Sequence, residues 1–115
     1  MNRGFKVTAK TNAEFLNINF GTSYKEWNQS TYDLDEETEV WMVTLDGSFQ
    51  NGVKNYFENG NIIEEINDNI RPTKLKRMVF QIIENYGVKT FIYLGVYRLD
   101  SNKSSENIRI FVPLK

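Results

Sequence analysis

The sequence contains no cysteine and no histidine. Without cysteine, disulfides, thiolate zinc sites and cysteine nucleophiles are excluded. Without histidine, the usual general base at neutral pH and the commonest metal ligand are missing. Long apolar runs are missing too, because no stretch approaches the ~18 apolar residues of a membrane span and the N-terminus lacks a secretory signal. We therefore expect a soluble, cytoplasmic protein with no membrane partner.

Familiar enzyme signatures are also absent. The chain has no phosphate-cradling glycine loop, no Gly-x-Ser-x-Gly elbow and no metal cluster based on His or Cys. A magnesium-dependent nuclease could use Asp46, Glu64 and Glu65, although no Glu-x-Lys spacing follows any of them. We expect no catalytic residue, no metal ligand and no cofactor, and we keep such a nuclease as a third alternative.

The clearest structural pattern lies between Lys76 and Leu99, where two apolar runs flank a break at residues 84–87. This pattern predicts a β-hairpin at the centre of a sheet, because the second run is apolar on both faces. Gly95 within it predicts a bulge, a bend or the close approach of another group such as a ring. Strict alternation places three rings on one face of this strand: Phe91, Tyr93 and Tyr97.

The other expected elements are shorter. Thr11 and Glu14 form a helix capping box, as do Ser23 and Glu26. Asn59-Gly60 predicts a hairpin turn, although helical spacing over residues 61–70 is the competing interpretation. Further strands are expected at residues 5–9, 39–45, 53–58, 61–66 and 108–114. A chain of 115 residues suits a single domain spanning 1–115. The fold class is therefore β-rich α+β, with a strongly curved, mostly antiparallel sheet or small open barrel and one or two short helices.

Charge is divided unevenly along the chain. Residues 1–70 carry twelve acidic and five basic side chains, whereas residues 71–115 carry three acidic and nine basic ones. The two halves could neutralise each other across the fold, or the second half could form a basic face. A basic face with an exposed ring would suit nucleic acid, because cations meet phosphates and rings stack on bases. The candidate residues are Arg71, Lys74, Lys76, Arg77, Lys89, Tyr93, Tyr97, Arg98 and Arg109. Alternatively, the aromatic stripe belongs to the core.

A second candidate is the polar loop, residues 46–55, which places amide, carboxylate, hydroxyl and aromatic groups around two glycines. Amide side chains present a donor and an acceptor together, as the recognition of a base edge or a small planar ligand requires. The plain-turn interpretation stays open. The candidate ligand residues are Asp46, Ser48, Phe49, Gln50, Asn51 and Asn55.

Three C-terminal segments, residues 77–83, 91–100 and 108–111, carry a resemblance. A strand ending in LGVYRLD, a polar loop and a closing RIF strand resemble the final strands of PUA-like domains, particularly the SRA-like type found beside prokaryotic restriction nucleases. The resemblance covers roughly residues 40–113 and implies a small curved sheet or near-barrel that binds nucleic acid. In some members a flipped, modified base is held between aromatic rings.

These observations favour a non-catalytic nucleic-acid-binding module of prokaryotic or phage type. The alternative is a protein-interaction or inhibitor domain whose acidic residues meet a basic protein partner and imitate a phosphate backbone. That acidic surface would comprise residues 33–39 with Glu64, Glu65 and Asp68.

Overall fold

A computed structural model describes residues 1–67 and 70–114. Its secondary structure is a nine-stranded sheet and one helix. The elements are β1 (Lys6–Ala9), α1 (Asn12–Phe20), β2 (Thr31–Asp33), β3 (Thr38–Val43), β4 (Phe49–Gln50), β5 (Val53–Glu58), β6 (Asn61–Ile66), β7 (Lys76–Asn85), β8 (Val88–Leu99) and β9 (Ile108–Pro113). No helix in the described ranges is long and apolar enough to cross a membrane.

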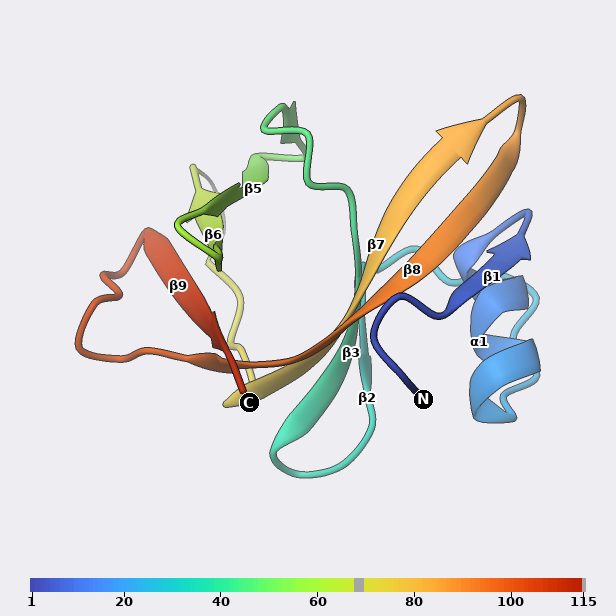
Figure 1. The fold of residues 1–115 in the computed structure, drawn as a ribbon, viewed down its shortest axis with the longest axis horizontal. Helices are drawn as coiled ribbons and strands as arrows, with labels where there is room; N and C mark the ends of the chain where they lie inside the picture. The colour runs from blue at the N-terminus through green and yellow to red at the C-terminus, as the bar shows by residue number, and fades with distance from the viewer. Residues whose placement is uncertain (68–69, 115) are drawn as a thin grey trace.

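The predicted central hairpin is confirmed as β7 and β8, which cross the whole molecule (Figure 1). The strands follow the order β2-β3-β7-β8-β9-β6-β5-β4, with β1 added beside β8. Pairing is antiparallel except between β3 and β7, so the expectation of a curved, mostly antiparallel, open sheet is confirmed. In Figure 1, β5, β6 and β9 lie on one side of this hairpin, and β1 and α1 lie on the other.

Both faces of β3 are buried, because the curved sheet covers one face and α1 covers the other. Val40 and Met42 belong to a cluster with α1, whereas Trp41 and Val43 belong to a second cluster with β6 and β9. Alternating side chains of one strand therefore enter two separate cores. This arrangement explains why residues 39–43 have no exposed face.

A β-bulge in β8 lies where this strand passes from one core to the other. Val79 pairs with Gly95 and the next residue, Phe80, pairs with Tyr93, so Leu94 is an extra residue. Gly95 has a positive φ of 108°, which confirms the predicted irregularity. The group that approaches Gly95 is the side chain of Arg3, whose Nε would lie 2.8 Å from an added Cβ, rather than a ring.

The bulge also corrects the prediction of a single aromatic face on β8. A shift of one residue moves the following side chains to the opposite face. Phe91 and Tyr93 consequently pack in the cluster with α1, and Tyr97 packs in the cluster with Phe111.

The first capping box is confirmed, and the second is wrong. Thr11 accepts a hydrogen bond from the backbone N–H of Glu14 (3.1 Å), and α1 follows. No helix follows Ser23 in the described structure. Instead, Asn17 of α1 binds the backbone of Tyr24 through both ends of its amide, and this contact holds the segment in an irregular path.

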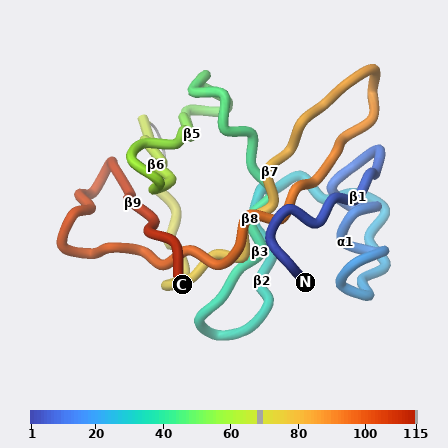
Figure 2. Tube along the Cα trace, viewed as in Figure 1, coloured from blue at the N-terminus to red at the C-terminus, as the bar shows by residue number. Residues whose placement is uncertain are grey.

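The Asn59-Gly60 hairpin is confirmed, and its two turn residues have positive φ values of 52° and 81°. The competing helical interpretation of residues 61–70 is wrong, because residues 61–66 form the strand β6. Figure 2 shows both ends of the chain on the lower side of the molecule. Arg3 fastens them, because its guanidinium donates to the carbonyl oxygen of Leu114 (2.6 Å).

Candidate functional site

A polar cavity of about 1040 Å³ lies beside β3 and β7. Its wall combines the start of α1, the segment before β2, the polar loop and one side of the β7–β8 hairpin. Five of the six predicted ligand residues line it: Asp46, Ser48, Gln50, Asn51 and Asn55. The exception is Phe49, which is not part of the wall and whose side chain is 51% exposed. The structure therefore brings nearly the whole predicted group to one cavity.

Local hydrogen bonds set the shape of the polar loop. The carboxylate of Asp46 accepts from the backbone N–H of Ser48 (2.9 Å) and from its hydroxyl (2.7 Å). These two bonds, the backbone one first, lower the pKa of Asp46 below its ordinary value, so the carboxylate is charged at neutral pH. Asn51 and Gly52 then form a turn with φ values of 53° and 79°, which reverses the chain into β5.

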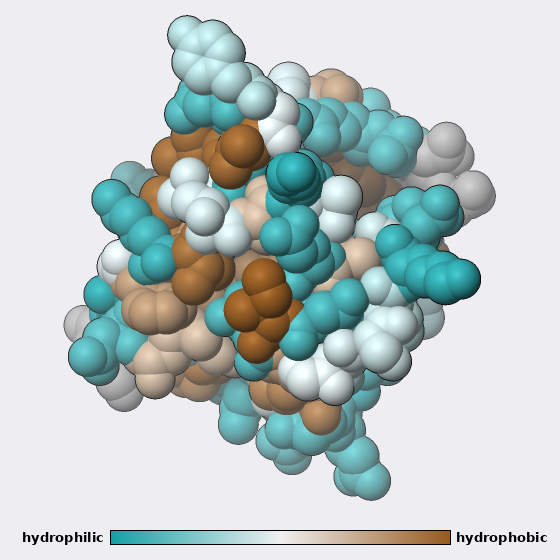
Figure 3. Space-filling model, turned by 90° about the vertical axis from the view of Figure 1, so that its right-hand side faces the viewer, coloured by the Kyte–Doolittle hydropathy of each residue, from teal (hydrophilic) through white to brown (hydrophobic). Residues whose placement is uncertain are grey.

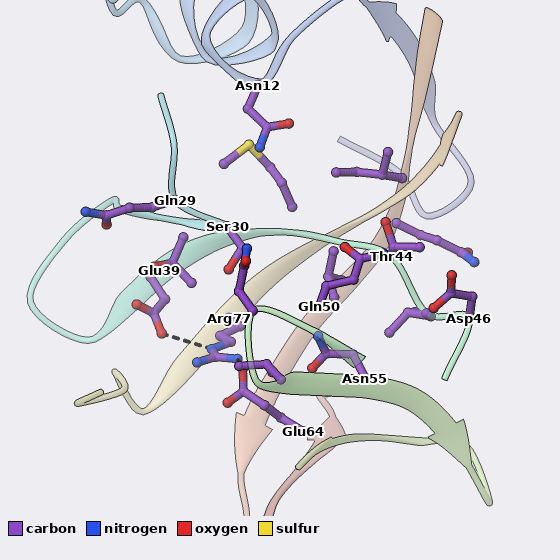
Figure 4. A pocket seen from close by; sticks show the side chains of 18 of the residues that line it. Asn12, Gln29, Ser30, Glu39, Thr44, Asp46, Gln50, Asn55, Glu64 and Arg77 are labelled. Carbon is purple, nitrogen blue, oxygen red and sulfur yellow. Dashed lines mark hydrogen bonds and ion pairs between the residues drawn. The ribbon is translucent and has the colours of Figure 1, made fainter. Parts of the chain in front are cut away.

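Asn55 on β5 has an unusual environment. Its side-chain oxygen Oδ1 is buried, yet it accepts no hydrogen bond from the described residues. An unpaired buried acceptor costs about 1–3 kcal/mol, and the great majority of such atoms in proteins have a partner. Figure 4 shows Asn55 beside Gln50 on the wall of the cavity. Asn55 thus contributes to the cavity wall an amide whose buried oxygen has no partner among the described residues.

The inner end of the cavity is a buried ion network of Glu39, Glu64, Arg77 and Arg109. Arg77 bonds Glu39 through Nε (2.9 Å) and Glu64 through a terminal nitrogen (3.1 Å), and Glu64 also bonds Arg109 (3.1 Å). The charges of these four side chains cancel, and each group has a partner. Figure 4 shows Arg77 between Glu39 and Glu64 at the centre of the site.

Two rings contact the guanidinium of Arg77. Its central carbon lies 4.2 Å from the ring centre of Trp41 and 4.4 Å from that of Phe111. The two ring centres are 5.4 Å apart, so the rings meet at one side of the guanidinium rather than on its opposite faces. Its nitrogens are bonded to the two carboxylates. Only 3% of Arg77 is exposed, so the expectation that it meets phosphate is wrong in this structure.

Arg109 requires the same correction. In the sequence, the alternation of Ile108, Ile110 and Val112 predicts that these three side chains face inward and that Arg109 faces outward. The opposite face is buried, because Arg109 pairs with Glu64 across β6 and β9 and Phe111 pairs with Ile62. The alternation was clear in the sequence, but the partner that makes a buried arginine tolerable lies 45 residues away.

The remaining predicted cations divide into two groups. Lys74 pairs with Asp33 (3.7 Å) and Lys76 with Glu37 (3.5 Å), so acidic residues of the first half neutralise basic residues of the second. In the described residues, no ion pair involves the others: Arg71, Lys89 and Arg98. Of these three, Arg71 and Lys89 line the polar cavity. The interpretation in which the two halves neutralise each other is thus the better description.

Tyr93 and Tyr97 are buried, each with 7% of its surface exposed, so the expectation of a solvent-facing ring on β8 is wrong. Burial raises the pKa of both phenols above the ordinary value, and the nearby charge of Arg3 opposes this shift. No described aromatic side chain lines the polar cavity. A planar ligand there would be recognised through its edge.

The acidic candidates divide between the exposed turn from β2 to β3, residues 33–37, and the interior. Glu39 and Glu64 are buried in the ion network, and Glu65 pairs with Lys54 (3.7 Å). Asp68, which belonged to the proposed acidic surface, lies outside the described residues. Within the described ranges, no three acidic side chains are placed to hold a metal ion. Sequence reasoning missed the pairing of Glu39 and Glu64 with arginines, for which their position on buried strands was the available signal.

Comparison with known proteins gives a match in fold. No family model and no curated protein matches the chain. Among the solved structures that share its fold is the 5-hydroxymethylcytosine-specific restriction enzyme AbaSI, with a TM-score of 0.69 and 18% sequence identity over 96% of this chain and 39% of that one. The chain thus spans about two fifths of that enzyme's length. At the level of the fold, this match supports the loose resemblance to SRA-like domains.

Proposed function

We propose that this chain is a non-catalytic nucleic-acid-binding module that reads the edge of a base in the polar cavity. The observation that carries this proposal is the unpaired Oδ1 of Asn55 on a wall rich in amides and hydroxyls. Such groups distinguish bases by their donors and acceptors. A buried acceptor without a partner favours a ligand that presents an N–H or O–H group.

Two cations on the cavity wall, Arg71 and Lys89, could contact phosphates, beside the carboxylates of Asp46 and Glu84. Neither cation forms an ion pair with a described residue, unlike Lys74, Lys76 and Arg77. Phosphate contacts of this kind supply affinity and register without reading sequence. The fold shared with an enzyme specific for 5-hydroxymethylcytosine is consistent with a modified base as the group that is read. The pairing of acidic residues leaves less support for the inhibitor alternative.

Binding to a short fluorescein-labelled DNA, followed by fluorescence anisotropy, tests this function. Single strands and duplexes would carry cytosine or 5-hydroxymethylcytosine at one position. We expect binding at low salt that weakens steeply between about 50 and 200 mM KCl, because phosphate contacts release counterions. No binding of either DNA at low salt would overturn the proposal.

Paired variants locate the phosphate contacts. Changing Arg71→Gln together with Lys89→Gln should weaken binding and lower the slope of log affinity against log salt by about two. The matched control is Lys54→Gln with Lys76→Gln, which removes two cations that are already paired with Glu65 and Glu37. Equal slopes for both double variants would place the phosphate contacts elsewhere.

A further inference from the structure

The turn of the central hairpin, Tyr86-Gly87, carries an aromatic ring in a position that folding does not explain. Tyr86 is 105% exposed, more than any other large apolar side chain described. In the described residues, its ring makes no aromatic contact and its hydroxyl makes no hydrogen bond. The ring therefore contributes no packing to the folded chain.

The backbone at this turn makes the choice of tyrosine unfavourable. Within residues 1–67 and 70–114, three non-glycine residues have positive φ: Asn51 (53°), Asn59 (52°) and Tyr86 (54°). Each is followed by a glycine, and two of the three are asparagine, the residue that best tolerates this conformation after glycine. Only the third turn replaces asparagine with a bulky ring. The other two turns therefore indicate that asparagine would be the more stable residue at position 86.

The position of the turn suits a residue that reaches a ligand. The hairpin projects from the body of the molecule (Figure 1), and the face seen in Figure 3 has a narrow projection at the top, where the turn lies. Residues 81–84 and Lys89, close to the turn, line the polar cavity.

We propose that Tyr86 stacks on a base of the nucleic acid whose neighbouring base enters the polar cavity, an inference that rests on the proposed function. The cavity wall has no described ring, so stacking must come from outside it. An exposed ring at the end of a stiff hairpin supplies a flat apolar surface, and Lys89, whose Nζ lies 3.5 Å from Asn12 Oδ1 at the cavity, would meet a phosphate. The backbone strain at Tyr86 lowers the stability of the fold, and the contact with a base would explain why the strained residue is retained.

The test is the variant Tyr86→Asn, which removes the ring and gives the turn the Asn-Gly sequence of the chain's other two positive-φ pairs. We expect its melting temperature to rise by a few degrees, because the backbone strain is relieved. Its affinity for the fluorescein-labelled DNA should fall about 5- to 150-fold, the loss expected for one base–ring stack. The salt slope should stay unchanged, because no charge has been removed.

Two controls separate the ring from other effects. Tyr86→Phe keeps the stack and should retain affinity within about twofold. Phe57→Thr removes a ring that is also exposed, on β5 in the other half of the molecule, and should leave binding unchanged. Single-stranded and duplex DNA, measured in parallel, show whether the ring stacks on a free base or enters a base step.

The outcomes are distinguishable. Wild-type affinity in Tyr86→Asn, with a normal response to Arg71→Gln and Lys89→Gln, would overturn the role of Tyr86 and leave the proposed function standing. Failure of the wild-type protein to bind any of the DNAs would overturn the proposed function itself.

Discussion

The inner end and the loop side of the polar cavity differ in whether their buried polar groups have hydrogen-bond partners. At the inner end, Arg77 has two carboxylate partners and contacts two rings. On the loop side, Asn55 keeps a buried acceptor with no partner among the described residues. Polar groups that satisfy each other stabilise a fold, whereas an unsatisfied group is a candidate for binding. At the inner end of the cavity, the polar groups thus stabilise the fold. On the loop side, a buried acceptor has no partner among the described residues.

The largest effect is expected when the inner end is broken. Arg77→Met should lower the free energy of unfolding by about 3–5 kcal/mol, because Glu39 and Glu64 would each lose a buried partner. Urea denaturation measures this change. Arg98→Met, on an exposed position of the neighbouring strand, is the control and should change stability by less than about 0.5 kcal/mol. Similar losses in both variants would show that the network is not a special source of stability.

A smaller effect of opposite sign is expected on the loop side. Asn55→Leu removes the unpaired acceptor and should raise the free energy of unfolding by about 1 kcal/mol while weakening DNA binding.

Asn17→Leu is the matched comparison for this prediction. The Asn17 oxygen accepts from Thr22 (2.6 Å) and from the backbone of Tyr24 (2.9 Å), so the variant leaves these donors unpaired. It should lose about 1–3 kcal/mol. A loss of stability in Asn55→Leu as large as that in Asn17→Leu would show that the Asn55 amide is structural.

The smallest effect concerns pH. Burial raises the folded-state pKa of Tyr93 and Tyr97, so their contribution to stability is complete below the unfolded value of 10.0. As the pH rises above that value, the unfolded chain releases these protons first, and stability falls. The double variant Tyr93→Phe with Tyr97→Phe should show a shallower fall of the urea midpoint in this range. Parallel curves for both proteins would contradict the prediction.

Local patterns in the sequence were enough to place most elements of the fold. The capping box at Thr11, the Asn59-Gly60 turn and the irregularity at Gly95 were each recognisable because their cause lies within a few neighbouring residues. The polar loop was recognisable for the same reason, since amides around two glycines form a turn with free side chains. Local chemistry therefore predicted a group of polar residues, five of which the structure places on one cavity wall.

The environment of the charged and aromatic residues was decided by long-range contacts. Glu39 meets Arg77 across 38 positions of sequence, and Arg77 contacts rings from β3 and β9. The bulge at Leu94 sent Tyr97 to a different core from Tyr93, which no period-2 pattern could show. By itself, the sequence determined the strands, the turns and the chemistry of the loop, because these depend on neighbours along the chain. Only the tertiary structure decided which cations stayed free and which rings were buried, because burial depends on partners that folding brings together.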